Sequence, residues 1–398
     1  MVEIFNFDEI IDRKKTNSFK WDFLKNIYGT DDLIPMWVAD MDFKSPPQVI
    51  EALKKRAEHG VFGYTFRPES YYKAMINWIK EKYDWEIKEN WISFTPGVVS
   101  GLKIAVHSFT KPGDNILIQT PVYHPFFDVI KNNGRNIAKN SLIHNSDNTY
   151  SIDYEDLEKK ISDKNTKMFI LCSPHNPIGK VWAMEDLIKM ANLCKKYNVI
   201  IISDEIHSDL VYKKNTHFPL ASISDEIADI TVTFYAPSKT FNIAGLETAN
   251  AVISNKYLRN EFNNTIERYG THMSNIFGIE ALMNSYKYGN EWLEELLIYL
   301  ESNIDYVISF FSEKLPEVKI PKPDSTYLLW LDFRRFGDEN KLQKIFIEKA
   351  KVGLEKGSVF GTEGLGFFRM NVGCPKAILE KACNNIYEAF KNYGGEEA

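Results

Sequence analysis

The chain has 398 residues, of which 44% are hydrophobic and 26% charged, a composition that excludes a disordered or fibrous protein. Its formal net charge of −6 argues against a nucleic-acid partner, because phosphate binding requires a basic surface. No apolar run approaches the ~18 residues that a membrane span requires, and we find no secretory signal pattern at the start.

The four cysteines are widely separated, and they form neither a CxxC pair nor a spacing typical of metal sites. We therefore expect reduced, buried thiols and no bound metal. Reduced thiols and the missing secretory signal together predict a cytoplasmic protein.

The first 45 residues are irregular and rich in aromatic side chains, and we expect them to pack as an arm against a small domain or a partner subunit. Apolar spacing then predicts helices over residues 48–59 and 71–83. Tyr64 lies in the turn between these helices, where it is free to contact another group. The alternative is an ordinary surface tyrosine.

A further helix is predicted to begin after Gly97 and to end near residue 109. Gly97, Val98 and Val99 would leave backbone N–H groups uncovered at the positive end of its dipole, where a phosphate is stabilised. A plain turn before a helix is the commoner explanation of such a sequence.

Strands and helices alternate in the next part of the chain. Apolar, β-branched runs predict strands over residues 115–118, 167–172, 199–202, 229–234 and 248–253, with helices over 125–132 and 184–197. This alternation predicts a mainly parallel sheet with right-handed crossovers, covered by helices on both faces. We therefore expect a large α/β domain over residues 46–285.

The pattern changes near residue 285. A long helix is predicted over residues 291–314, followed by strands over 326–333 and 367–372 and helices over 341–351 and 375–393. Residues 286–398 are therefore expected to form a second, smaller α/β domain.

Polar residues follow three successive predicted strands of the large domain: Asn176, Asp204 and Lys239. Their spacing fits one strand–helix–strand unit each, so all three can face one cleft at the carboxyl edge of the sheet. Burying a charged lysine at this position would lower the stability of the protein, so we expect its amine to have a function. Burial lowers the pKa of an amine, and a neutral amine attacks an aldehyde to form a Schiff base.

These residue types suit pyridoxal phosphate, which draws electrons into a protonated pyridine ring. Lys239 would carry the aldehyde, Asp204 would hold the ring proton, and Asn176 would donate to the phenolic oxygen. Tyr123 would stack on the ring, while Ser238 and the helix start described above would take the phosphate. Each residue also has an ordinary explanation: a solvated lysine, a capping aspartate, a turn-forming asparagine or a core tyrosine.

Motifs along nearly the whole chain resemble those of one enzyme family. They are residues 36–43 (MWVADMDF), 63–65 (GYT), 121–127 (PVYHPFF), 172–182 (CSPHNPIGKVW), 203–210 (SDEIHSDL), 236–245 (APSKTFNIAG) and 368–371 (FRMN). Together they resemble the fold-type I pyridoxal-phosphate enzymes, which are aspartate-aminotransferase-like. Within these the chain is similar to the cystathionine β-lyase and cystalysin branch, often labelled MalY/PatB.

This resemblance implies that Lys239, Asp204 and Tyr123 form the catalytic centre. It also implies that Arg369 binds the α-carboxylate of an amino-acid substrate as a bidentate fork, although a surface ion pair is the alternative. Asn176 and the backbone near Val38 and Ala39 would assist it.

In the same family the residue equivalent to Tyr64 reaches the active site of the neighbouring subunit. The resemblance therefore implies a homodimer in which Tyr64 contacts the cofactor phosphate across the interface.

Two residues depart from the aminotransferase pattern, which has Tyr three residues after the aspartate and Arg eight residues after the lysine. This chain has His207 and Glu247 at these positions. Without that arginine, the phosphate must depend on Ser238, the helix start and Tyr64. His207 is as compatible with a core imidazole as with a cofactor contact, and both departures favour the lyase branch.

The expected reaction is α,β-elimination from L-cystathionine, L-cystine or a related cysteine S-conjugate, which gives a thiol, pyruvate and ammonia. A class I/II aminotransferase is the nearest alternative because it begins with the same removal of the Cα proton. A regulatory protein that binds a transcription factor is a second alternative.

Overall fold

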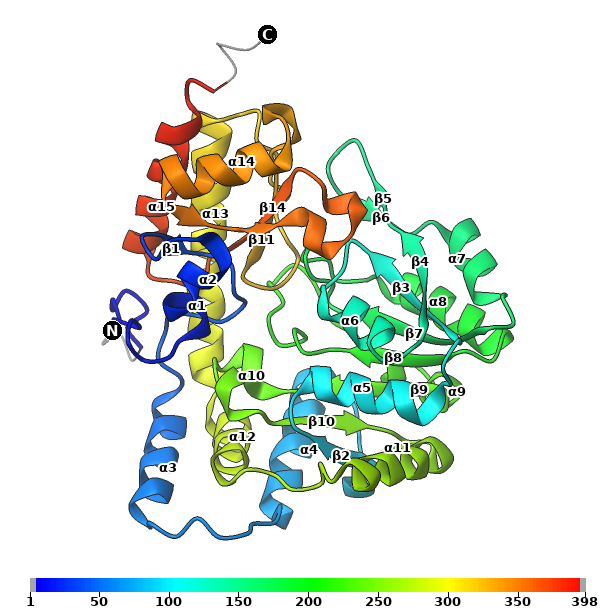
Figure 1. Ribbon diagram of the computed structural model, residues 1–398. Coiled ribbons are helices and arrows are strands. Elements are labelled where there is room, and N and C mark those ends of the chain that lie inside the picture. Colours follow the sequence, from blue (N-terminus) through cyan, green and yellow to red (C-terminus); the bar gives the residue numbers. More distant parts are fainter. Residues whose placement is uncertain (1–4, 394–398) are drawn as a thin grey trace.

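The computed structural model describes residues 5–393 and contains two α/β units that lie side by side (Figure 1). The larger unit is built on a seven-stranded sheet and the smaller on a three-stranded sheet. A mainly parallel sheet with a smaller α/β unit beside it is the architecture that the sequence predicts. Among the described residues no helix combines the length and apolar character needed to cross a bilayer.

The large sheet has the strand order β2-β10-β9-β8-β7-β3-β4. Six strands run in the same direction, and β10 is antiparallel to both of its neighbours. The predicted strands of this unit are confirmed, whereas β2, β4 and the reversed direction of β10 were not predicted. The bounds are β2 (Ile92–Thr95), β3 (Asn115–Thr120), β4 (Asn136–Ser141), β7 (Thr166–Cys172), β8 (Ile200–Asp204), β9 (Thr231–Tyr235) and β10 (Ala249–Val252).

Helices cover both faces of this sheet because successive strand residues alternate between two hydrophobic clusters. In β7, for example, Ile170 packs under the first set of helices and Phe169 and Leu171 under the second. The first set is α5 (Val98–Phe109), α6 (Pro125–Lys131) and α11 (Lys256–Tyr269), and the second includes α7 (Tyr154–Ile161) and α8 (Met184–Lys196).

The smaller unit has the antiparallel strand order β11-β14-β13, with β11 (Leu328–Asp332), β14 (Phe367–Asn371) and β13 (Glu355–Lys356). It is accompanied by α13 (Asn290–Lys314), α14 (Glu339–Ile345) and α15 (Lys376–Phe390). The strands expected at β11 and β14 and the helices expected at α13 and α15 are confirmed. The helix predicted over 341–351 is α-helical only to Ile345 and continues as a π-turn over Phe346–Ala350.

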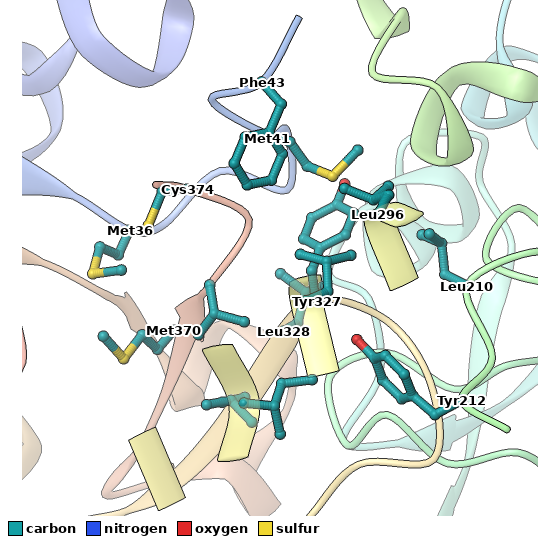
Figure 2. Packing of buried hydrophobic residues seen from close by; sticks show 14 of the residues in the cluster. Met36, Met41, Phe43, Leu210, Tyr212, Leu296, Tyr327, Leu328, Met370 and Cys374 are labelled. Carbon is teal, nitrogen blue, oxygen red and sulfur yellow. The ribbon is translucent and has the colours of Figure 1, made fainter. Parts of the chain in front are cut away.

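The amino-terminal residues contain two short helices, α1 (Phe19–Asp22) and α2 (Leu24–Tyr28), and one short strand, β1 (Ile34–Pro35). β1 pairs in parallel with β12 (Val352–Gly353) of the smaller unit. Figure 2 shows Met41 and Phe43 of this segment packed near Tyr327 and near Leu296 of α13. A single hydrophobic cluster therefore joins the segment, α13 and the small sheet.

Three further helices pack at the lower edge of the molecule in Figure 1: α3 (Pro47–Glu58), α4 (Glu69–Tyr83) and α12 (Ile276–Tyr288). The helices predicted over 48–59 and 71–83 are thereby confirmed, whereas α12 was not predicted. The remaining short elements are β5 (Ile143–His144), β6 (Tyr150–Ser151), α9 (Asp225–Ala228) and α10 (Pro237–Thr240).

Candidate active site

Lys239 lies on α10, the single helical turn that directly follows β9. Its side chain lines a cavity of about 250 Å³, and its Nζ donates a hydrogen bond of 2.7 Å to the carbonyl of Ala39. Burial lowers the pKa of this amine to about 8, despite opposing contributions from Asp40 and Asp204. Lys239 is thus a buried amine with a substantial neutral fraction near neutral pH.

Asp204 ends β8, the strand beside β9, and lines the same cavity. It is 3% exposed, and the only hydrogen bond that reaches its carboxyl group from the described residues comes from the backbone N–H of Ile206, at 3.2 Å. Burial raises the pKa of Asp204 to about 7, against a lowering by this N–H and by Lys239. A buried carboxyl with so few donors fits a cationic N–H group in the cavity.

Asn176 follows β7 and also lines the cavity. Its Oδ1 accepts a hydrogen bond of 3.1 Å from Nη1 of Arg369, whereas no described residue accepts from its Nδ2. The amide nitrogen is therefore available to donate to a ligand oxygen.

Arg369 comes from β14 of the smaller unit and is 2% exposed. Besides the contact with Asn176, its Nη2 donates a hydrogen bond of 2.8 Å to the carbonyl of Trp37. Its Nε is buried and has no hydrogen-bond partner among the described residues. Burial lowers the pKa of Arg369, and nearby Glu355 opposes that shift. A buried cation with an unused donor is suited to binding an anion.

The opposite end of the cavity is formed by the start of α5 and by Ser238. Gly97, with φ of 86°, turns the chain into this helix, and no side chain caps its first N–H groups. Val98 and Val99 line this end as well, so uncovered backbone donors face the cavity. This arrangement fits a phosphate group. Glu247 lies at the same end, with φ of 42°.

Tyr123 and His207 both line the cavity. Burial raises the pKa of the Tyr123 hydroxyl to about 12, and Asp204 contributes in the same direction. Burial and the nearby Lys239 and Arg369 lower the pKa of His207 to about 3, so its imidazole is neutral. The His207 Nδ1 atom is buried without a partner among the described residues, which leaves it available to a ligand.

Of the remaining predicted residues, Val38 and Ala39 belong to a backbone segment beside Lys239, whereas Tyr64 lies away from the cavity. Ala39 lines the cavity, and the carbonyl of Val38 accepts a hydrogen bond of 2.6 Å from Asn371. Tyr64 is 99% exposed on the loop between α3 and α4, and it does not line the cavity of its own chain.

Residues 37–42 contribute more to the site than the sequence indicated, because the carbonyls of this segment hold several side chains of the site. The Ala39 carbonyl accepts from Lys239 and from the Tyr327 hydroxyl, and the Asp40 carbonyl accepts from Asn371. Main-chain contacts of this kind leave no signal in a sequence, so the importance of Tyr327 and Asn371 was missed.

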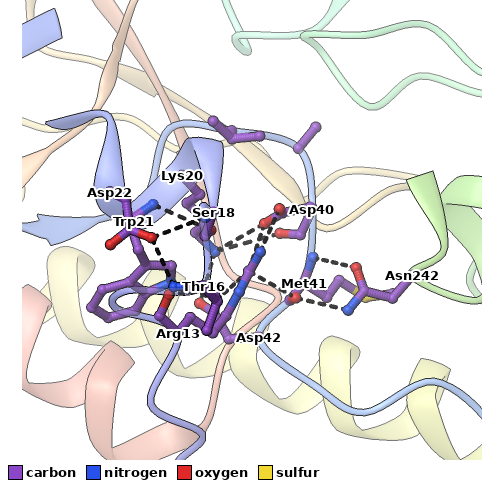
Figure 3. Close-up of polar contacts among 12 residues, drawn as sticks. Arg13, Thr16, Ser18, Lys20, Trp21, Asp22, Asp40, Met41, Asp42 and Asn242 are labelled. Atoms are coloured by element: carbon purple, nitrogen blue, oxygen red, sulfur yellow. Dashed lines mark hydrogen bonds and ion pairs between the residues drawn. The ribbon is translucent and has the colours of Figure 1, made fainter. Parts of the chain in front are cut away.

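Charged residues of the amino-terminal segment hold this loop in place (Figure 3). Arg13 forms a bidentate pair with Asp40, with distances of 2.9 and 2.8 Å, and buried Lys20 lies 2.7 Å from Asp42. Asn242, three residues after Lys239, exchanges two hydrogen bonds with the backbone of Met41. The loop is thus tied to the arm on one side and to the lysine segment on the other.

Taken together, the cavity offers a buried amine, an under-satisfied carboxyl, an available amide donor and a helix start without a cap. These groups fit the aldehyde, ring nitrogen, phenolic oxygen and phosphate of pyridoxal phosphate, the group expected from the sequence.

Comparisons with known proteins agree with this arrangement. The model of the family described as aminotransferase class I and II matches residues 31–386. The chain is 45% identical to cystathionine beta-lyase PatB of Bacillus subtilis, over 97% of this chain and 100% of that protein.

Two solved structures are also similar over nearly their whole length. A PLP-bound putative aminotransferase from Clostridium difficile 630 has 44% identity and a TM-score of 0.95, over 97% of this chain and 99% of that one. Cystalysin from Treponema denticola, which contains pyridoxal 5'-phosphate, has 38% identity and a TM-score of 0.94, over 98% and 99%.

Proposed function

This chain belongs to the aminotransferase class I and II family, and within it to the MalY/PatB group of pyridoxal-phosphate-dependent C–S lyases; from that membership we propose its reaction. It cleaves L-cystathionine, L-cystine or a related cysteine S-conjugate by α,β-elimination to a thiol, pyruvate and ammonia. The observation that carries the proposal is the buried Lys239 amine, which shares one cavity with Asp204 at adjacent strand ends.

The cofactor would be held by residues from five segments of the large unit. When bound, pyridoxal phosphate supplies an aldehyde that condenses with amines and a ring that withdraws electrons from the substrate Cα. Lys239 would hold the aldehyde carbon, Asp204 would accept a hydrogen bond from the ring nitrogen, and Asn176 would donate to the phenolic oxygen. Tyr123 would pack against the ring, while Ser238 and the start of α5 would donate to the phosphate.

Arg369 would bind the α-carboxylate of the substrate. Its guanidinium is already fixed by the Trp37 carbonyl and by Asn176, so little side-chain entropy is lost when the carboxylate binds. Fixing the carboxylate restricts rotation of the substrate and holds its Cα–H bond toward Lys239.

Lys239 would remove the Cα proton of the substrate. An amine with a pKa of about 8 is neutral in a useful fraction of molecules at pH 7 to 8, so it can accept the Cα proton of the bound substrate. The C–S bond at Cβ then breaks, and the ammonium of Lys239 would return the proton to the departing sulfur. The aminoacrylate that remains is released and hydrolysed by water to pyruvate and ammonia. In this proposal Lys239 acts first as base and then as acid.

We further propose that two chains form a homodimer and that Tyr64 enters the neighbouring site. Tyr64 stands with Val61, Phe62 and Phe66 on an exposed loop, and large apolar side chains gathered on a surface favour burial against a partner. Among residues 5–393 no side chain forms a hydrogen bond or an aromatic contact with Tyr64 that would explain its position.

We retain the predicted division of the chain into an arm (1–45), a large domain (46–285) and a small domain (286–398) as a proposal. The pairing of β1 with β12 supports grouping the arm with the small domain. A cytoplasmic location is likewise proposed, on the ground that all four cysteines are free and buried.

The test separates elimination from amino transfer. Purified protein is incubated with L-cystathionine or L-cystine, and pyruvate is measured with and without an added keto acid. Pyruvate release independent of the keto acid is expected for the lyase. Stoichiometric amino transfer without pyruvate would instead assign the chain to the aminotransferases, the activity after which the family is described.

A further inference from the structure

Glu355 is a carboxylate beside Arg369 that neither the motifs nor the proposed reaction uses. It lies on β13 directly opposite Arg369 of β14. Residues opposite each other in an antiparallel pair project from the same face of the sheet, so both side chains reach the same region. Its side chain is 17% exposed.

The contact between these two charges is loose. Oε2 of Glu355 lies 3.7 Å from Nη2 of Arg369, beyond hydrogen-bond distance, and no residue in the described part of the chain donates a hydrogen bond to this carboxylate. Elsewhere the same protein forms a close bidentate pair, between Arg13 and Asp40. Glu355 therefore partly offsets the charge of Arg369 without forming a hydrogen bond to it, so its oxygens can still accept from a ligand cation.

Glu355 does not itself line the cavity, but it lies beside Arg369, which donates a hydrogen bond to Asn176 of the cavity wall. Its charge contributes to raising the pKa of Tyr28 and of Tyr123, after burial in both cases, so it lies within electrostatic reach of the tyrosine that lines the cavity. Burial raises the pKa of Glu355 itself. A mostly buried carboxylate without a donor is stabilised when a cation binds to it.

We propose that Glu355 binds the distal ammonium group of substrates that carry a second amino-acid end, such as L-cystathionine, and so selects them over S-alkyl cysteines. The proposal rests on the proposed lyase function, because it assumes that Arg369 binds the α-carboxylate of the reacting end. A carboxylate at Arg369 adds a negative charge beside Glu355, and an ammonium group from the other end of the substrate would offset it.

The experiment compares two substrates in the loaded enzyme. Values of kcat/KM for pyruvate release are measured with L-cystathionine, which has a distal ammonium, and with S-methyl-L-cysteine, which has none. In Glu355→Gln we expect the ratio of the two values to fall about tenfold, because a charge-assisted contact is lost for one substrate alone. Glu355→Asp, shorter by one methylene, should lower the ratio less.

The matched control is Lys356→Gln, which removes a charge from the next residue of β13 and from the opposite side of the strand. Its ratio should equal that of the wild type. An unchanged ratio in Glu355→Gln overturns the proposal, as does an equal loss for both substrates, which would make Glu355 only a modulator of Arg369.

A binding measurement keeps this inference separate from the lyase function. L,L-2,7-diaminosuberate and L-2-aminosuberate differ only in the distal amino group, and neither contains sulfur. Calorimetric titration of the wild-type holoenzyme should give tighter binding of the diamino compound, and Glu355→Gln should remove most of that preference. If no pyruvate forms but this preference is found, the lyase proposal fails and the role of Glu355 stands; equal binding in the wild type overturns it.

Discussion

The amine of Lys239 donates a hydrogen bond to the Ala39 carbonyl and to no carboxylate among the described residues, and burial lowers its pKa from 10.5 to about 8. In the unfolded chain the lysine keeps its ordinary pKa. Between about pH 8 and 10.5 the unfolded state therefore binds more protons than the folded state, and stability rises with pH. The cost of burying the charge is full below about pH 8 and disappears above about pH 10.5.

Lys239→Met should accordingly stabilise the cofactor-free protein, and more so at lower pH. The gain at about pH 7.5 should exceed the gain at about pH 10 by about 2 kcal/mol, since most of the linkage lies between these values. The gain is measured as the difference in the free energy of unfolding between the two apo proteins, from urea unfolding at both pH values. Titrating groups that do not interact with Lys239 are common to both proteins and cancel, so an equal gain at both pH values would contradict the pKa shift.

Asp204 is the second residue whose charge can be tested alone. Asp204→Asn keeps the size of the side chain but removes the negative charge that would pair with the ring nitrogen. We expect weaker binding of pyridoxal phosphate and a fall in kcat of about 100-fold. Absorbance titration with the cofactor and a pyruvate assay measure these changes. Asp147→Asn, on an exposed turn, serves as control, and wild-type affinity and kcat in Asp204→Asn would refute the assigned role.

At the scale of elements, the position of α5 determines where its uncovered N–H groups point. Gly101 lets this helix lie directly on β9, because a Cβ atom at this position would overlap the ring of Phe234. The Phe234 side chain is fully buried and cannot move away freely. The contact therefore links the strand that precedes Lys239 to the helix proposed to hold the phosphate.

Gly101→Ala should displace α5 from the sheet. Overpacking of this kind costs about 1–3 kcal/mol, and the displaced helix start should weaken the binding of pyridoxal phosphate about tenfold. Thermal unfolding of the apo protein and a cofactor titration measure the two effects. Lys103→Ala, on the exposed side of the same helix, is the control. Lower stability with unchanged cofactor affinity would mean that α5 does not position the phosphate.

The elements that carry the site were predictable because β7, β8 and β9 are buried on both faces and so have long apolar, β-branched sequences. The polar residues at or after the ends of these strands, Asn176, Asp204 and Lys239, were therefore recognisable in the sequence. The edge strands β2 and β4 lack such continuous apolar runs, and the direction of β10 depends on its neighbours.

Glu355 was not predicted, because its position also depends on contacts with a neighbouring strand. It lies on a strand of two residues, and only the pairing of β13 with β14 places it opposite Arg369. Such a register is set by tertiary contacts, since a two-residue segment has no periodicity that a sequence could reveal.

At the scale of the whole molecule, the site depends on both units at once. Lys239 and Asp204 come from the large unit, whereas Arg369 comes from the small one, and residues 37–42 contact both. The hydrophobic cluster shared by the arm, α13 and the small sheet fixes the small unit relative to this loop. The distance between Lys239 and Arg369 is therefore a property of the whole chain.

The proposed dimer extends this dependence to a second chain and can be tested by complementation. Tyr64→Ala and Lys239→Ala should each be nearly inactive. When the two are unfolded together and refolded at equal amounts, half of the dimers pair one variant with the other. Each of these contains one site with both an intact lysine and an intact partner tyrosine, so about a quarter of the wild-type activity should return. Recovery that stays at the sum of the separate variants would show that Tyr64 acts within its own chain or outside the site.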